Sequence, residues 1–299
     1  MATMKLAYCL STLVAGALAS GSSDAYYSSV TAGQGFSCGV LEETGRVECW
    51  GDGALPMDDP SLDAIEAQLM DVNHKSISGG GFHVCGLYYD GEERGENLKA
   101  YCVGSFKADE VQDKKQLEIP ELENGLVWKE MSAGGMHSCG IDSDRMVTCW
   151  GAEDGNRRNL GDYATMKHRH ISAGAGVTTC GVLMDRTGYC VGDVLQGMLP
   201  AEYEKTKFRM LEAGGAFTYG LIKGSRELIK FGPGAGELIP TTPPSGFRSV
   251  KTLQIAAGAA HVCAMGRRNR KAIGKGYPAK GAWCAGTGTT EITGISPDA

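Results

Sequence analysis

The chain has 299 residues, of which 42% are hydrophobic and 21% charged, so it has enough apolar material for a globular core. Its mild net charge of −6 excludes a basic protein that binds nucleic acid through its charge. The 44 glycines follow no triplet period, which excludes collagen and indicates many tight turns.

Residues 1–19 have the features of a signal peptide. Lys5 precedes the apolar run LAYCLSTLVAGALA, which ends in the small residues that signal peptidase needs. The run is short for a bilayer span, although a retained anchor is the alternative, and no later stretch reaches 18 apolar residues. We therefore expect a secreted chain that starts near Ser20 and has no membrane span. Cys9 leaves with the signal peptide, and the ten remaining cysteines indicate disulfides.

Residues 28–290 contain six copies of one unit. Each copy has a glycine-rich segment, a strand that carries a cysteine, a turn, and a second signature such as CWG. The first cysteines and their one replacement are Cys38, Cys85, Cys139, Cys180, Tyr219 and Cys263, which are 47, 54, 41, 39 and 44 residues apart. The units start near residues 28, 75, 129, 169, 209 and 253, and this period predicts a repeat architecture.

The units predict strands, with two exceptions between them. Residues 60–70 have apolar residues at helical spacing, and residues 107–124 form a long charged excursion. A unit of this size cannot bury its apolar faces alone, but a ring of units can. We predict an all-β fold in which residues 20–299 form a single β-propeller domain. It has six short blades, or seven if one is degenerate, and residues 26–31 and 289–295 close the ring.

The two cysteines of a unit flank its turn symmetrically, so a hairpin places them opposite each other on neighbouring strands. Directly opposed residues have Cβ atoms about 4.5–5.5 Å apart, which is close to what a disulfide requires. The fifth unit has lost both cysteines together and carries Tyr219 and Lys230 instead. The predicted bridges are Cys38–Cys49, Cys85–Cys102, Cys139–Cys149, Cys180–Cys190 and Cys263–Cys284.

Two patterns in the units resemble sites of chemistry. His83, His137 and His261 each lie two residues before a cysteine, but zinc sites space their cysteines two to four residues apart, so we predict hydrogen bonds within each unit instead. Ser37 lies in the sequence GFSCG, which matches a nucleophile elbow, but the predicted context is a hairpin strand. We predict no metal, no cofactor and no catalytic residues.

The pattern A-G-x-x-x-x-C-G…C-W-G resembles the extracellular repeats of crinkly-type plant receptor kinases. It is more distantly similar to the repeats of the regulator of chromosome condensation and of the type II β-lactamase inhibitor protein. The resemblance covers residues 28–290 and implies four-stranded propeller blades, usually seven of them. This chain shows six signatures and no kinase, so kinase function is not implied.

The leading hypothesis is a secreted, non-catalytic module that binds an extracellular protein or peptide, with inhibition of a secreted enzyme as a subtype. The alternatives are an extracellular hydrolase, carbohydrate-active or other, with its site at the central channel, and a structural wall or matrix component. Variable loops over 88–99 and 267–280 supply the candidate contacts, although the basic loop is also typical of a solvated hairpin tip. The candidates are Tyr88, Tyr89, Arg94, Arg267, Arg268 and Arg270.

Overall fold

The computed structural model describes residues 27–51, 72–91, 98–104, 115–192, 198–232, 250–268 and 280–286, apart from the single residues 35, 42, 82, 216, 226 and 260. The predicted signal peptide, the predicted helix at 60–70 and the predicted closing segment 289–295 lie outside this part. No helix in the described ranges has the length and hydrophobicity that a membrane span requires.

The described strands form six antiparallel sheets, each made of three strands that are consecutive in the chain. Sheet 1 contains β1 (Tyr27–Ala32), β2 (Phe36–Leu41) and β3 (Val47–Gly51); sheet 2 contains β4 (His74–Gly79), β5 (His83–Tyr89) and β6 (Leu98–Gly104). Sheet 3 contains β7 (Trp128–Ala133), β8 (His137–Asp142) and β9 (Val147–Gly151); sheet 4 contains β10 (His168–Ala173), β11 (Thr178–Leu183) and β12 (Gly188–Gly192). Sheet 5 contains β13 (Phe208–Ala213), β14 (Thr218–Ile222) and β15 (Leu228–Phe231); sheet 6 contains β16 (Val250–Ala257), β17 (His261–Arg268) and β18 (Lys280–Gly286).

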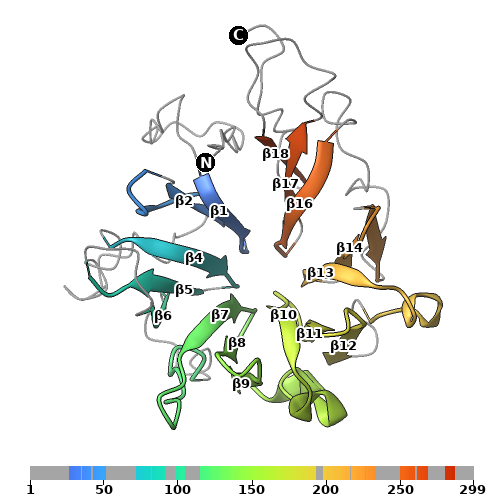
Figure 1. Ribbon diagram of the computed structural model, residues 1–299, viewed down its shortest axis with the longest axis horizontal. Coiled ribbons are helices and arrows are strands. Elements are labelled where there is room, and N and C mark those ends of the chain that lie inside the picture. Colours follow the sequence, from blue (N-terminus) through green and yellow to red (C-terminus); the bar gives the residue numbers. More distant parts are fainter. Residues whose placement is uncertain are drawn as a thin grey trace, which may run out of the picture.

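The six sheets stand around a central axis, and the first strand of each sheet lies nearest to it (Figure 1). Middle strands such as β8 (HSCGID) are buried along their whole length, because a sheet between two others faces protein on both sides. Buried clusters join each sheet to the next, from sheet 1 through sheet 6. This arrangement is the predicted β-propeller.

Backbone hydrogen bonds at the glycine-rich turns link neighbouring sheets. The bonds run from Gln34 N to Gly80 O (3.0 Å), Gly81 N to Gly134 O (2.8 Å), Gly135 N to Gly174 O (2.9 Å), Gly176 N to Gly214 O (3.3 Å) and Ala259 N to Gly33 O (3.4 Å). The last bond joins sheet 6 directly to sheet 1. A Cβ atom at Gly134 would lie 2.8 Å from the Gly174 carbonyl oxygen, so the repeated glycine permits this approach of two turns.

Three of the predicted disulfides are confirmed: Cys85–Cys102, Cys139–Cys149 and Cys180–Cys190. In each, the two cysteines are direct partners in the strand register. Cys38 and Cys263 are also disulfide-bonded, and the register places Cys49 and Cys284 opposite them. The side chains of Cys49 and Cys284 lie outside the described ones, so these two pairings stay predictions. In sheet 5, Tyr219 faces Lys230 at the same position.

The prediction of four strands per blade differs from the described sheets, which have three. After β9 the chain forms the 3-10 helices η1 (Asp154–Asn156) and η2 (Gly161–Thr165), and η3 (Ala201–Tyr203) follows sheet 4. The described part of the charged excursion packs on sheet 3. The carbonyl oxygen of Gln116 there accepts hydrogen bonds from Trp150 Nε1 and Ser138 Oγ, both at 2.9 Å.

The repeated histidines bond across units, not within them as predicted. The Nε2 atom of His83 lies 2.8 Å from Ser138 Oγ, and that of His137 lies 2.8 Å from Thr179 Oγ1. His261 Nε2 lies 3.3 Å from Ser37 Oγ, which connects sheet 6 to sheet 1. The histidines therefore help to hold the ring of sheets together.

Candidate functional site

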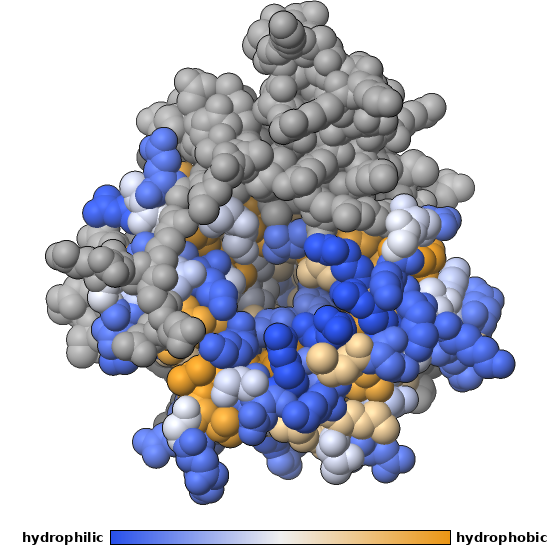
Figure 2. All heavy atoms as spheres, viewed as in Figure 1, coloured by the Kyte–Doolittle hydropathy of each residue, from blue (hydrophilic) through white to orange (hydrophobic). Residues whose placement is uncertain are grey.

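A polar cavity of about 230 Å³ lies on the axis, where the first strands of all six sheets meet. Hydrophilic residues gather around the centre of the ring on the face shown in Figure 2. Every one of the six described sheets contributes side chains to this cavity, which makes it the candidate site.

The local backbone explains which side chains reach the cavity. Each first strand has a register shift near its beginning, directly before one cavity-lining position. Such bulges commonly redirect side chains. The residues at this position, which we name the first tier, are Ser29, Ser76, Glu130, His170, Met210 and Gln254. Two residues further along, the second tier is Thr31, Ser78, Ser132, Ser172, Glu212 and Ala256.

All four second-tier hydroxyls have a structural partner in the next sheet. Each accepts a hydrogen bond from a backbone N–H at the end of the next first strand, which joins the inner strands of sheets 1 to 5. The bonds are Gly79 N to Thr31 Oγ1 (2.7 Å), Ala133 N to Ser78 Oγ (3.0 Å), Ala173 N to Ser132 Oγ (2.9 Å) and Ala213 N to Ser172 Oγ (3.0 Å). This tier therefore holds the ring together.

Charged side chains interrupt this pattern in sheets 3 to 5. His170 Nδ1 lies 2.7 Å from Glu130 Oε1, and His170 Nε2 lies 2.9 Å from Glu212 Oε1. Burial alone would lower the pKa of His170, but the two carboxylates raise this pKa well above its ordinary value. The imidazole is therefore an imidazolium that donates to both carboxylates, and the three groups together carry one net negative charge.

The carboxylates are held by further hydrogen bonds. Ile171 N donates to Glu130 Oε1 (3.1 Å), and Ser172 Oγ donates to Glu212 Oε2 (3.2 Å). Both ring nitrogens of His170 face carboxylates, so the imidazole has no lone pair for a metal. Within the described ranges, no group of three His, Cys, Asp or Glu side chains is arranged to hold a metal ion.

Ser37 and His261 have the contact expected of a nucleophile and its base, but they lie in the wrong surroundings. Ser37 is 4% exposed and belongs to β2, within a hairpin. The same histidine–hydroxyl contact recurs in two other sheet interfaces, which indicates a structural role. The predicted assignment of Ser37 to the structure, not to catalysis, agrees with this geometry.

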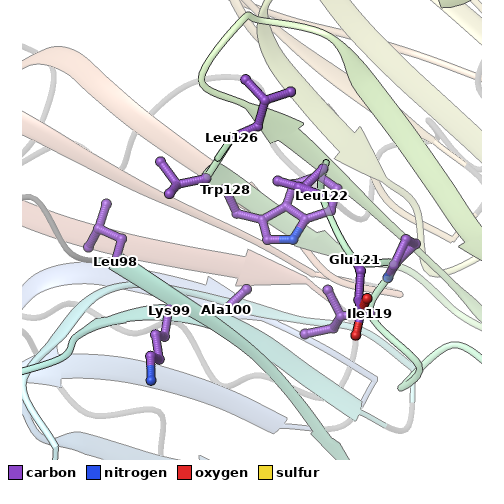
Figure 3. A pocket seen from close by; sticks show the side chains of 10 residues that line it. Leu98, Lys99, Ala100, Ile119, Glu121, Leu122, Leu126 and Trp128 are labelled. Carbon is purple, nitrogen blue, oxygen red and sulfur yellow. The ribbon is translucent and has the colours of Figure 1, made fainter. Parts of the chain in front are cut away.

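A second hollow lies at the rim between β6 and β7 and has a volume of about 400 Å³. Trp128 lies in its wall, surrounded by aliphatic side chains that include Leu98, Ile119 and Leu122 (Figure 3). Trp128 is 7% exposed, and its ring packs against Trp150 with the centroids 5.7 Å apart. Ile119 and Leu122 pack against the same buried cluster. The rim hollow is thus an indentation in the core between sheets 2 and 3.

None of the sequence-predicted contact residues that the structure describes is part of the lining of the axial cavity. Tyr88 and Tyr89 belong to β5 and are half-buried, and Tyr88 packs against the Tyr101 ring at 6.2 Å between centroids. Arg267 and Arg268 are the last residues of β17 and not part of a loop. The register aligns Arg267 with Lys251 and Lys280. Arg94 and Arg270 lie outside the described residues.

Sequence reasoning missed the axial cluster. Glu130, His170 and Glu212 are about 40 residues apart, and none lies in a motif. Their common signal is position: all three fall on the first strand of a unit, where the other units have uncharged residues at the equivalent positions. An alignment of the first strands, in addition to the cysteine strands, would have revealed them.

Comparisons with known proteins agree with this fold. No family model matches the chain. The serine/threonine-protein kinase-like protein CCR2 of Arabidopsis thaliana is 26% identical over 161 residues, which are 52% of this chain and 20% of that protein. The match thus spans about a fifth of the length of this curated relative.

Three solved structures share the propeller. The CRINKLY WD40 ectodomain of the Arabidopsis thaliana receptor kinase ACR4 has a TM-score of 0.59 at 21% identity, over 90% of this chain and 83% of that one. The ectodomain of the Physcomitrella patens receptor kinase CR4 gives 0.56 at 22% identity, over 86% and 61%. Prp20p from Saccharomyces cerevisiae gives 0.54 at 16% identity, over 91% and 77%. The predicted resemblance to crinkly-type and chromosome-condensation-regulator repeats is confirmed at the level of the fold.

Proposed function

We propose that this chain is a secreted, non-catalytic β-propeller that binds an extracellular protein or peptide. The observation that carries the proposal is the division of roles among equivalent positions. The disulfides recur within the sheets and brace their hairpins, and the glycine turns and second-tier hydroxyls join one sheet to the next. The first tier differs in almost every sheet and lines a cavity. A rigid frame with a varied, concave site is typical of a binding module.

The fold relatives support a binding role without identifying the partner. The CRINKLY domains are ectodomains of receptor kinases, and the Prp20p structure was described together with its binding to Gsp1p and histones. Secretion is supported by the disulfides, which persist in oxidising compartments. Inhibition of a secreted enzyme is one form that such binding takes.

A hydrolase is the second candidate, because Glu130 and Glu212 lie in one cavity. Glycoside hydrolases use two carboxyl groups, of which one is a protonated general acid. Here both carboxyl groups are engaged by the ring of His170, so neither stands apart as the proton donor that this chemistry requires. The axial geometry therefore favours binding over hydrolysis.

The test is affinity capture by the folded, disulfide-bonded chain from culture medium, followed by calorimetry with each purified captured protein. We expect saturable binding with a defined stoichiometry, and none with the reduced, unfolded chain as the matched control. A lack of any saturable partner, together with glycoside hydrolysis that Glu130→Gln abolishes, would contradict the proposal and establish the hydrolase.

A further inference from the structure

The axial cavity holds polar groups whose bonding is incomplete. Ser29, Ser76 and Gln254 line it from sheets 1, 2 and 6, and their side chains have no hydrogen-bond partner among the described residues. Ser29 is only 7% exposed. Such hydroxyl and amide groups are available to hydrogen-bond a ligand in the cavity. The second-tier hydroxyls of Thr31 and Ser78, by contrast, are both bonded.

The charges of the side chains that line the cavity do not cancel. Glu130, His170 and Glu212 are the only charged side chains among the described residues that line it, and they sum to one negative charge. Both oxygens of Glu212 and Oε1 of Glu130 accept hydrogen bonds, whereas Glu130 Oε2 accepts none from the described residues. Glu130 is also the most exposed of the three, at 29%.

The unbonded polar groups and the unbonded oxygen of Glu130 lie at the same level of the cavity. The unbonded groups of Ser29, Ser76 and Gln254 belong to the first tier, as does Glu130. On one side, a ligand at this level would meet the unbonded oxygen of Glu130 beside the His170 imidazolium, whose single charge is exceeded by the two carboxylates of Glu130 and Glu212. On the other side it would meet neutral hydroxyl and amide groups. That combination suits a group that carries one positive charge and several N–H donors.

We propose that the first tier binds the cationic side chain, arginine or lysine, of the protein or peptide partner; this rests on the proposed function. The net negative charge disfavours an anion. No aromatic side chain lines the described cavity for stacking against a sugar. The volume of about 230 Å³ is smaller than that of most small-molecule sites, about 300–1,000 Å³, and suits a single inserted side chain.

The test is a selection of random displayed peptides on the folded chain, read as enrichment of each residue type. We expect arginine or lysine at one position in nearly all bound peptides. In Glu130→Gln, which keeps the shape and an oxygen acceptor for His170, binding of a selected peptide should weaken about tenfold or more. The matched control is Glu121→Gln, which removes the same charge from the rim hollow and should leave binding unchanged.

Each other outcome has a distinct meaning. Binding of peptides without a preferred cation, or with equal affinity for the Glu130→Gln variant, would overturn this inference and leave the proposed function standing. Absence of any bound peptide and of any captured partner would overturn both. A blocked arginine, N-acetyl-arginine amide, should bind far more weakly than the peptides. If it binds equally well, the site is one for small free cations, and the proposed partner side chain is wrong.

Discussion

The interface between sheets 5 and 6 is apolar, whereas the interface between sheets 6 and 1 is polar, although both use equivalent positions. In the first, Phe217 and Val262 belong to one buried cluster. In the second, His261 bonds Ser37 at 3.3 Å. Val262 and His261 are adjacent in β17, so one strand presents an apolar side chain to one neighbour and a polar one to the other.

The other interfaces follow the same matching. His83 meets Ser138, and His137 meets Thr179. At the interface between sheets 1 and 2 the equivalent residues, Phe36 and Val84, share an apolar cluster. Between sheets 4 and 5 both positions carry threonine, Thr178 and Thr218, and both are buried. The position does not require a particular residue; it requires that the two partners match.

Acid is expected to have the largest effect, because it protonates several buried histidines of the polar interfaces at once. Burial lowers the pKa of His83 to about 4, and burial with the nearby Arg157 charge lowers that of His137 to about 3. The unfolded chain, with histidine pKa values near 6.5, therefore binds more protons below pH 6.5, and stability falls as the pH drops. Each of these two histidines should contribute about 1.4 kcal/mol per pH unit in this window. Urea unfolding at pH 7 and at pH 5 measures this loss of stability.

The contribution of His170 to stability changes with pH in the opposite direction. The acid effect of His83 and His137 is therefore measured below pH 6.5. Its raised pKa means that its stabilisation is complete below pH 6.5 and is lost as the pH rises through the folded value. Replacing His261 and Ser37 by Phe and Val removes one of the histidines whose pKa is lowered. The acid dependence should then become shallower; an unchanged slope would contradict the assignment of the loss to the interfaces.

Loss of a disulfide is expected to have the second-largest effect on stability. Cys180→Ser with Cys190→Ser opens a bridge with a sequence separation of 10 and should lower the free energy of unfolding by roughly 3 kcal/mol. Sheet 5 has no such bridge, and Tyr219 there is fully buried with its ring 5.6 Å from that of Phe217.

The reverse exchange in sheet 5 is the control. Tyr219→Cys with Lys230→Cys should gain a bridge but lose a buried aromatic ring, which costs about 3–5 kcal/mol. We therefore expect no net gain in the midpoint of urea unfolding. A clear rise in stability would show that aromatic packing does not replace the disulfide in sheet 5.

Exchanging one interface for the other is the most direct test and has the smallest expected effect. His261→Phe or Ser37→Val alone leaves one buried polar group unmatched and should cost about 1–3 kcal/mol. The double variant reproduces the pair found between sheets 1 and 2 and should recover most of this loss. A double-mutant cycle on urea unfolding measures the coupling. Additive losses would show that the pairs are not matched.

Much of the axial site could not have been predicted from motifs. The cavity requires six strands to meet, and its charged residues come from three units whose spacing along the chain varies. Glu130 has no local feature that distinguishes it from other glutamates on predicted strands. The paired interface residues were within reach, because aligned units show histidine followed one unit later by Ser or Thr.

The sequence by itself determined the hairpins, the register of their cysteines and the all-β repeat. Those contacts are local: Cys139 and Cys149 are 10 residues apart, and the turn between them dictates which residues face each other. Tertiary structure alone decided that His170 lies between Glu130 and Glu212, and that the repeated histidines reach the next sheet. These contacts join equivalent positions in different units, so they exist only once the ring has closed and each strand has received its neighbours.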